Sequence, residues 1–328
     1  MKYILGIETT AHTFGVAVVD FEGKILSNVK DSYTTNEGGM IPLEVRKHHR
    51  EVATKIYETA LIKAQIKPKQ IEVIAVSNAP GLAPCLLEGL DFVKKLAKEL
   101  KLKIVEVNHC IAHLEIGEIT GAKDPVLLYA SGANTQIIAY EAGKYRVFGE
   151  TLDLGVGNFI DTFARFAKIG FPGGPKIEVL ASNCKNKEEL LDLPYSVKGM
   201  DVSFSGMQTK LKHLLGKIPI EDLSYSMQEI TFAMLIEVAE RALAHTGKTE
   251  LVLGGGVACN SRLQEMAKKM CDDRGVKFFC PDRQFLIDNA AMIAYLGLKM
   301  YNVGLAKNAE DVDIRPRERT DDVVVSWK

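Results

Sequence analysis

The sequence predicts an α/β protein made of two similar lobes that face each other across a cleft. A strand–loop–strand–hairpin–strand pattern occurs at residues 3–26 and again at residues 126–148. A strand–glycine turn–helix–strand–helix pattern occurs at residues 71–119 and again at residues 250–300. Because the same order of elements is present twice, and 328 residues suffice for two cores, we expect the chain to fold as a structural duplication.

The first pattern joins three strands through a polar loop and a tight turn. In the first copy the stretches are 3–10, 15–20 and 25–26, with the turn at Glu22-Gly23-Lys24. In the second they are 126–132, 135–140 and 145–148, with the turn at Ala142-Gly143-Lys144. The loops between the first two strands are rich in Thr, Ser, Gly and Asn, which can turn backbone N–H groups toward a phosphate. Each stretch alone is compatible with an ordinary hairpin, so it is their repetition that favours a duplicated fold.

The second pattern ends in a helix that opens with a polar residue. The elements of the first half are a strand at 71–76, a turn at 80–82, a helix at 84–100, a strand at 103–107 and a helix that starts at His109. Those of the second half are a strand at 250–253, a turn at 254–256, a helix at 260–273, a strand at 276–279 and a helix at 290–300 that Asp288-Asn289 opens. His109 and Asp288 therefore occupy corresponding places.

Composition limits the classes of function. The chain is 47% hydrophobic and 25% charged, as expected of a globular protein, and its formal net charge is −1. No global positive field attracts nucleic acid, so any RNA contact requires a local patch or partner subunits. The six cysteines show no C-x-x-C spacing, which predicts reduced thiols and a cytoplasmic location. No leader pattern and no bilayer-spanning apolar run is evident, so we expect no membrane association.

A histidine pair is the strongest chemical signal. On a helix over residues 109–119, His109 and His113 lie on one face, within reach of a single metal ion such as zinc or iron. Two facing lobes would bring Asp288 to the opposite wall and complete a site of two imidazoles and one carboxylate. The H-E-x-x-H signature of metalloproteases is not met, because Cys110 replaces the Glu that acts as general base. The alternative is a pair of satisfied core histidines.

Two further stretches suggest nucleotide binding. The turn Gly254-Gly255-Gly256 and Asn260 lie between a strand and a helix, where a backbone can approach a ligand closely, although no Walker sequence follows and a plain tight turn is the alternative. Asp161 lies off the apolar stripe of a helix marked by Phe159 and Phe163, so it could accept from ribose hydroxyls or be a solvated acid. Arg46-Lys47-His48-His49, on a helix predicted at 42–64, indicates a basic, solvated surface, with contact to tRNA or a partner as the alternative.

Six segments add a more specific signal: Val107–Glu115, Leu128–Thr135, Pro172–Pro175, Val202–Gly206, Gly254–Asn260 and Asp288–Ile293. In order and spacing they resemble the universal tRNA threonylcarbamoyladenosine synthesis family, the TsaD and KEOPS catalytic-subunit family, over about residues 3–327. The residues at Asn108–His113, Tyr129 and Lys198–Asp201 resemble those of the archaeal and eukaryotic branch of this family.

The resemblance implies a fold and a metal site. The fold would be the duplicated actin-like ATPase fold of sugar kinases and Hsp70, with a first lobe at 1–124, a second lobe at 125–300 and a C-terminal segment at 301–328 that packs back on the first lobe. One divalent iron or zinc ion would be held by four residues of this chain: His109, His113, Asp288 and Tyr129.

The resemblance also implies a nucleotide site and a reaction. Adenosine and phosphate would be held by Gly254, Gly255, Gly256 and Asn260, ribose and base by Asp161, Gly174 and Glu178, and the phosphates would lie near Ser131 and Asn134. The ligand would be ATP, AMP or threonylcarbamoyl-adenylate. The implied reaction moves the threonylcarbamoyl group to N6 of the adenosine 3′ of the tRNA anticodon, with a small protein kinase and dimerising subunits of a KEOPS-like complex as partners. A metabolite kinase or ATPase of the same superfold, or a nucleotide-binding scaffold subunit, are the alternatives.

Four positions depart from the family pattern. Ala83, Ala133, Ile287 and Ala290 stand where the family commonly has glycine. A side chain there would keep a ligand from the backbone or forbid a positive φ, and this expectation bears most on phosphate contacts by residues 131–135.

Overall fold

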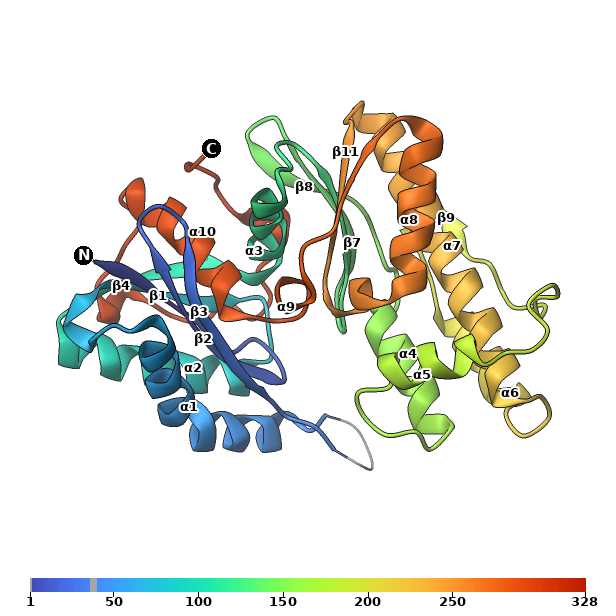
Figure 1. Cartoon of the computed structure of the whole chain (residues 1–328), viewed down its shortest axis with the longest axis horizontal. Helices are drawn as coiled ribbons and strands as arrows, with labels where there is room; N and C mark the ends of the chain where they lie inside the picture. The colour runs from blue at the N-terminus through green and yellow to red at the C-terminus, as the bar shows by residue number, and fades with distance from the viewer. Residues whose placement is uncertain (1, 36–39) are drawn as a thin grey trace.

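The computed structural model describes residues 2–35 and 40–328, and in these residues the strands form two five-stranded sheets and one two-stranded sheet (Figure 1). The first large sheet has the order β3-β2-β1-β4-β5, with β1 Tyr3–Glu8, β2 Thr13–Asp20, β3 Ile25–Ser32, β4 Ile71–Ala79 and β5 Lys103–Asn108. The second has the order β12-β11-β6-β7-β8, with β6 Val126–Ala130, β7 Thr135–Glu141, β8 Lys144–Glu150, β11 Glu250–Gly254 and β12 Lys277–Phe279. The small sheet pairs β9 Val197–Lys198 with β10 Asp201–Val202.

The two large sheets have the same topology. Strands β1, β2 and β3 are antiparallel neighbours, and β4 and β5 extend the sheet in parallel from β1. Strands β6, β7 and β8 are antiparallel in the same way, and β11 and β12 extend that sheet in parallel from β6. The predicted α/β duplication is confirmed strand by strand.

Helices cover both faces of the first sheet. Helix α1 Pro42–Ala64 packs on β2 and β3, and α2 Ala83–Leu100 packs on β4. Helix α10 Ala290–Asn302 crosses β1, β2 and β4 on the other face. It lies so close that a Cβ on Gly6 would be 2.4 Å from the carbonyl oxygen of Ala290, so only glycine fits at this crossing.

The second sheet carries a larger helical layer. Helix α7 Ile220–Thr246 packs on β6 to β8 and against three further helices of this layer, α5 Gly174–Ser182, α6 Ser205–Leu214 and α8 Ser261–Arg274. Helix α4 Val156–Phe166 also belongs to the layer. Short 3₁₀ turns lie at Pro68–Gln70, Ile116–Thr120, Gly256–Cys259, Ala309–Asp311 and Thr320–Asp322.

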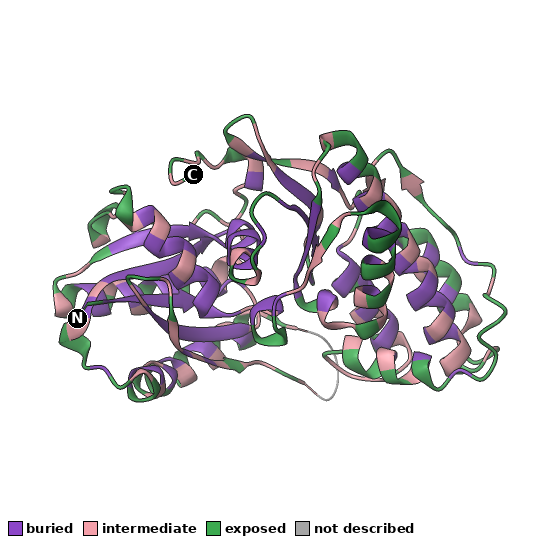
Figure 2. Ribbon diagram, turned by 45° about the horizontal axis from the view of Figure 1, so that its top comes forward, coloured by how far each residue is buried: buried purple, intermediate pink, exposed green. Residues whose placement is uncertain are grey.

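A shared apolar core joins the two lobes. It combines the inner faces of both sheets with α3 His109–Glu115 and α10 (Figure 2). Val107 and Ala75 of the first sheet and Leu127 and Val252 of the second are all fully buried in it. Burying apolar surface on both sides of α3 fixes this helix between the sheets, where it carries the histidine pair.

The chain crosses between the lobes near its end. Residues 290–300 of α10 fall inside the range expected for the second lobe, yet the helix packs on the first sheet. The segment after it follows the first lobe, with a bridge between Ile104 and Lys307 and a hydrogen bond from Gly81 N–H to the carbonyl of Pro316. Further on, Arg319 pairs with Glu150 of β8. The C-terminal segment therefore contacts both sheets rather than the first lobe alone.

Two local expectations need correction. The helix expected over 109–119 is α-helical only to Glu115 and continues as a 3₁₀ turn. His49, expected on a solvated face, is fully buried, and its Nε2–H donates to the carbonyl of Ala11 over 2.9 Å. His48 Nε2 lies 2.8 Å from Asp31 Oδ1. Tertiary packing of α1 against the first polar loop overrides the polar character of these side chains.

Among the helices of residues 2–35 and 40–328, we find none with the length and apolar character needed to traverse a bilayer.

Candidate metal centre and nucleotide cleft

The candidate metal ligands come from two equivalent helix starts. Asn108 caps α3, since its side chain accepts from the N–H groups of Cys110 and Ile111 at 3.1 and 3.3 Å, and His109 follows directly. Asn289 caps α10 by accepting from Met292 N–H at 3.1 Å, and Asp288 precedes it. A polar cap that satisfies the first N–H groups of a helix fixes the backbone at this point. The duplication thus delivers an imidazole from one lobe repeat and a carboxylate from the other.

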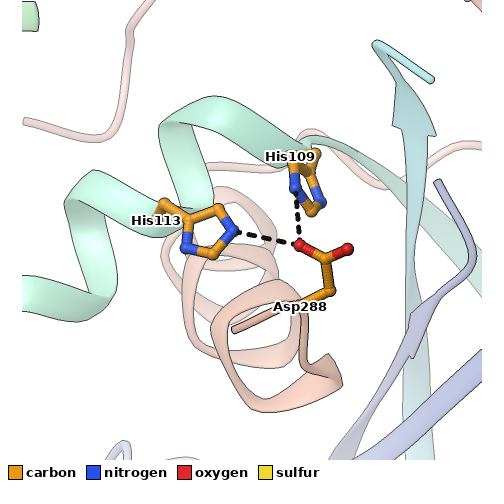
Figure 3. Close-up of side chains that lie close together, drawn as sticks. All are labelled: His109, His113 and Asp288. Atoms are coloured by element: carbon orange, nitrogen blue, oxygen red, sulfur yellow. Dashed lines mark ion pairs between the residues drawn. The ribbon is translucent and has the colours of Figure 1, made fainter. Parts of the chain in front are cut away.

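The predicted triad meets at one point (Figure 3). Oδ1 of Asp288 lies 3.4 Å from His109 Nε2 and 3.6 Å from His113 Nε2, and one ligand atom from each residue lies within 4.8 Å of the others. Asp288 is 175 or more positions from either histidine in sequence, yet the three side chains converge as expected. The separation suits one cation placed between them.

The residues fit a bound divalent cation. Both ring nitrogens of His113 are buried and lack a hydrogen-bond partner within the described chain, which is costly for a polar group unless another ligand satisfies it. His109 Nδ1 donates to Glu8 Oε2 over 2.9 Å, which leaves Nε2 facing Asp288. A carboxylate that orients the far nitrogen of a metal-binding imidazole is a recurrent arrangement in zinc sites. Two nitrogens and an oxygen suit zinc or iron.

The electrostatics of the triad favour a cation. Burial opposes charge on His109, but Glu8 and Asp288 outweigh it and raise the pKa of this imidazole well above its ordinary value. Burial lowers the pKa of His113, which keeps that imidazole neutral and able to bind a metal. Burial also opposes ionisation of Asp288, but its contacts with His109 and His113 hold its pKa well below the usual range. The site therefore offers a carboxylate anion and a neutral nitrogen donor.

Tyr129 lies beside the triad. Its ring centroid is 5.0 Å from that of His113, and the residue lines the same cavity as Asp288. Burial raises the pKa of its phenol well above the ordinary value, so it is a neutral phenol unless a cation displaces the proton. Its place as a fourth ligand stays a prediction.

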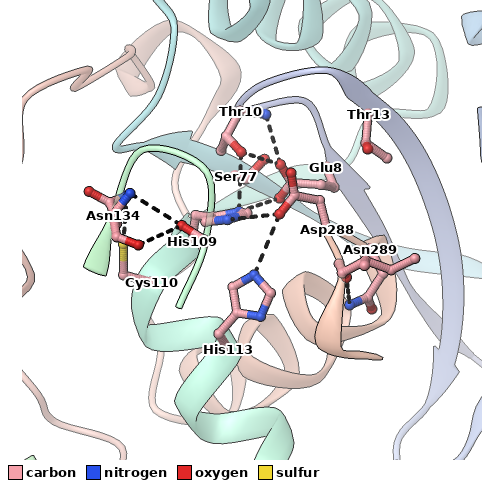
Figure 4. A network of polar contacts seen from close by, with 12 residues as sticks. Glu8, Thr10, Thr13, Ser77, His109, Cys110, His113, Asn134, Asp288 and Asn289 are labelled. Atoms are coloured by element: carbon pink, nitrogen blue, oxygen red, sulfur yellow. Dashed lines mark hydrogen bonds and ion pairs between the residues drawn. The ribbon is translucent and has the colours of Figure 1, made fainter. Parts of the chain in front are cut away.

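A polar network behind His109 was missed by sequence reasoning (Figure 4). Glu8 is fully buried at the end of β1 and accepts from Thr10 N–H at 2.7 Å and Thr10 Oγ1–H at 2.5 Å. Ser77 of β4 accepts from Thr9 N–H at 3.0 Å. The signal was present in the sequence, because Glu8 is the lone acid in an otherwise apolar strand.

The triad opens into a cleft of about 630 Å³ between the lobes. Most of the residues expected at a nucleotide line this cavity: Ser131, Asn134, Asp161, Gly174, Glu178, Gly256 and Asn260. His109 and Asp288 line it too. Gly254, Gly255 and His113 do not. A cavity of this size is large enough for a nucleotide-sized ligand next to the triad.

The glycine turn has a structural part and an exposed part. Gly255 has φ +89°, and a Cβ there would lie 2.3 Å from the carbonyl oxygen of Ala130. Gly254 ends β11 and lies against Leu127, where a Cβ would approach the leucine to 3.0 Å. Gly256 alone of the three faces the cavity. Asn260 caps α8 through Arg262 N–H at 2.9 Å, and its amide donates to Gln228 Oε1 at 2.9 Å.

The two acids of the second lobe already hold backbone groups. Asp161 Oδ1 accepts from Gly173 N–H at 2.7 Å, and burial raises the pKa of this carboxyl. Glu178 Oε1 accepts from the N–H and hydroxyl of Ser261 at 2.8 and 2.7 Å. Each therefore helps to fix a loop of the cleft, whether or not its other oxygen meets a ligand.

The four positions that depart from the family's glycines have ordinary backbone conformations. Within residues 2–35 and 40–328, the non-glycine residues with positive φ are Gln65, Lys101, Ala142 and Lys168. Ala83, Ala133 and Ala290 are not among them. Ile287, with φ −81°, is not among them either, so the backbone takes no positive φ at the four positions. That their side chains keep a ligand from the backbone stays a prediction.

Two cations in the cleft were not predicted. Lys30 of β3 donates to the carbonyl oxygen of Asp288 over 2.9 Å and lines the cavity. Burial lowers its pKa to about 8, although Asp288 opposes this effect. Arg283, the first residue of α9 Arg283–Leu286, lines the same cavity.

Solved structures with a similar fold share little sequence with this chain. Full-length HypF in its phosphate- and nucleotide-bound form matches with a TM-score of 0.60 and 12% identity, covering 93% of this chain and 56% of that one. Component A of the (R)-2-hydroxyglutaryl-CoA dehydratase of Acidaminococcus fermentans matches with a TM-score of 0.58 and 12% identity, covering 92% of this chain and 100% of that one. These matches confirm the predicted duplicated actin-like ATPase fold.

Sequence relatives are much more similar. A Thermococcus kodakarensis protein named tRNA N6-adenosine threonylcarbamoyltransferase is 53% identical over 325 residues, 98% of this chain and 99% of that protein. A Methanosarcina barkeri protein named probable bifunctional tRNA threonylcarbamoyladenosine biosynthesis protein is 50% identical over 99% of this chain and 60% of its own length. The family model described as TsaD, tRNA N6-adenosine threonylcarbamoyltransferase, matches residues 24–295. The chain therefore belongs to the TsaD family of tRNA N6-adenosine threonylcarbamoyltransferases.

Proposed function

We propose that this protein transfers the threonylcarbamoyl group of threonylcarbamoyl-adenylate to N6 of the adenosine 3′ of the anticodon in tRNA, releasing AMP. The observation that carries the proposal is the convergence of His109, His113 and Asp288 beside a cleft of about 630 Å³, which His109 and Asp288 line. Membership of the TsaD family supports the choice of substrate.

The chemistry requires positioning rather than a protein nucleophile. The carbamoyl carbon of an acyl phosphate is already activated, so attack by the adenine N6 needs alignment and stabilisation of the developing charge. A zinc or iron ion held by His109, His113 and Asp288, with Tyr129 as a fourth contact, would supply a Lewis acid for substrate oxygens. Glu8 keeps the imidazole of His109 oriented by accepting from Nδ1–H over 2.9 Å. The recipient adenine must leave the anticodon stack to enter the cleft.

The second lobe is proposed to bind the nucleotide. Its candidate contacts are Ser131, Asn134, Asp161, Gly174, Glu178, Gly256 and Asn260, which line the cleft, with Gly254 and Gly255 shaping the turn behind them. The proposed lobe boundaries remain 1–124, 125–300 and 301–328, with α10 packed on the first sheet.

The proposed partners are tRNA, a small protein kinase and dimerising subunits of a KEOPS-like complex in the cytoplasm. A chain with a net charge of −1 attracts RNA poorly, because it has no overall positive field. We therefore propose that partner subunits help it to bind tRNA. The relative named bifunctional extends beyond the part matched here, since this chain spans 60% of its length. The remaining part of that relative is joined to the matched part in one chain. We propose that a separate partner protein supplies the corresponding part for this chain.

The test combines metal content with tRNA modification. We expect His109→Ala protein, with partners present, to lose bound iron or zinc and to lose at least about a hundredfold of its modification rate while folding normally. His213→Ala, on the exposed face of α6, is the matched control and should retain both. Modification by His109→Ala at the unaltered rate would contradict the proposal. Phosphate transfer from ATP to a metabolite, without tRNA modification, would favour a kinase instead.

A further inference from the structure

Lys30 is a partly buried cation with few partners. It lies near the end of β3, and the one hydrogen bond of its ammonium group goes to the carbonyl oxygen of Asp288. Within the described residues it forms no ion pair. An ammonium group has three donors, so two of them point to the cleft or to solvent. A cation removed from much of its water, without a counterion, is costly unless a ligand compensates.

Arg283 brings a second positive charge to the same cavity from a different element. It opens α9, is exposed, and forms no ion pair in the part of the chain that the structure describes. Its charge acts on Lys30, since it opposes protonation of that amine. Two like charges that face one cavity from different elements repel each other until an anion lies between them.

The carboxylate of Asp288 is not available as that anion. Its Oδ1 lies 3.4 and 3.6 Å from the imidazoles of His109 and His113, and Lys30 contacts the main chain of Asp288 rather than its carboxylate. Asp288 therefore offsets part of the charge of Lys30, but within the described residues neither Lys30 nor Arg283 forms an ion pair with a carboxylate. A guanidinium and an ammonium group are the usual protein donors to carboxylate and phosphate oxygens.

We propose that Lys30 and Arg283 form an anion-binding subsite beside the His109–His113–Asp288 triad, which binds an oxyanion of the donor substrate. This inference rests on the proposed function, whose donor carries two such groups: the threonine carboxylate, which stays with the transferred group, and the phosphate, which leaves with AMP. Both offer the same ligand chemistry, so binding experiments must separate them.

The experiment measures binding to the full metal-loaded chain by calorimetry, without tRNA. The probes are a non-hydrolysable analogue of threonylcarbamoyl-adenylate, which carries both anions, and AMP, which carries only the phosphate. We expect Lys30→Met and Arg283→Gln each to weaken binding of the analogue about tenfold or more, as for a lost charged hydrogen bond. Lys24→Met removes an exposed charge from the β2–β3 turn and should have no effect.

The AMP result assigns the anion. Unchanged AMP affinity with weakened analogue binding identifies the threonine carboxylate, whereas an equal loss for both probes identifies the phosphate. Lys30→Arg should retain most of the affinity, and unchanged melting temperatures would show that the variants fold. Unaltered binding of the analogue by both charge-removing variants overturns the subsite. If the unaltered protein binds neither probe, the proposed function falls and the subsite with it, a result distinct from a failure confined to the variants.

Discussion

The polar loops of the two lobes occupy equivalent places but are held in different ways. The loop between β1 and β2 is fixed by side chains, since His49 donates to Ala11, Ser77 accepts from Thr9 and Glu8 accepts from Thr10. The loop between β6 and β7 is held to its neighbouring helix by main chain, since Gly157 N–H and Asn158 N–H of α4 donate to the carbonyls of residues 131 and 132 over 3.0 and 2.9 Å. Within the loop, Ser131 Oγ–H donates to the carbonyl of Asn134 at 3.0 Å.

This difference follows from what each loop approaches. The first loop lies behind His109, and its charged and titratable neighbours orient a candidate metal ligand. The second lies on the proposed nucleotide side, where the start of α4 contacts its backbone directly. The same fold, used twice, thus has one loop held mostly by side chains, between β1 and β2, and one loop held to its neighbouring helix by main chain, between β6 and β7. The second loop should tolerate changes of side chain but not of backbone space.

The largest expected effect tests the loop between β6 and β7. Gly155→Ala places a Cβ 2.4 Å from the carbonyl oxygen of Gly132 and 2.5 Å from that of Ala133, although its own φ of −63° suits alanine. We expect a loss of about 3 kcal/mol of unfolding free energy, from overpacking against main chain that cannot yield. Denaturant titration measures it, with AMP affinity as a second readout.

Gly206→Ala is the matched control, because the nearest atom to an added Cβ is Pro194 Cβ at 3.9 Å and alanine favours the helix. Equal stabilities for the two variants would show that the second loop moves aside, and the contrast between the lobes would be lost.

An intermediate effect tests the loop between β1 and β2. Glu8→Gln keeps the size of the side chain but removes the charge that faces His109 Nδ1. We expect metal affinity to fall about 10- to 100-fold, as for other removed partners of metal-binding histidines, while AMP affinity stays unchanged. Competition with a chelator measures the first and calorimetry the second. A parallel loss of both affinities would mean that the two halves of the cleft are not separable.

The smallest effect is a pH dependence confined to the first lobe. Burial lowers the pKa of His49 from 6.5 to about 4, so below pH 6.5 the unfolded chain binds a proton that the folded chain does not. The contribution of the neutral His49 to the free energy of unfolding is therefore present above pH 6.5 and is lost as the pH falls toward 4. We expect the free energy of unfolding to fall by about 1 kcal/mol between pH 7 and pH 5.5 because of His49.

His49→Gln, which can still donate to Ala11, should be less sensitive to pH by that amount in thermal denaturation. The neighbouring His48→Gln is the control, because His48 is less buried than His49 and pairs with the exposed Asp31. A pH profile of His49→Gln that coincides with that of the unaltered protein would show that the first loop does not depend on a neutral imidazole.

The local sequence pattern was enough to predict most helices and strands and the candidate metal ligands. The helix at 42–64 begins and ends where it was expected, because Pro42 starts it and Gln65 leaves the helix with φ +56°. The triad was predicted because His109 and Asp288 follow equivalent strands of a repeat. Glu8 and His49 were missed or misread, since a lone acid in a strand and a basic pair on a helix look the same whether buried or solvated.

By itself the sequence determined the repeat, the periodicity of strands and helices, and the caps at Asn108 and Asn289, since each depends on contacts within a few residues. Only the tertiary structure decided that α10 lies on the first sheet and that Asp288 comes within 3.6 Å of both imidazoles. It also decided that Lys30 reaches Asp288. Those contacts join segments more than 170 residues apart, and they form because both sheets bury their inner faces on one shared core.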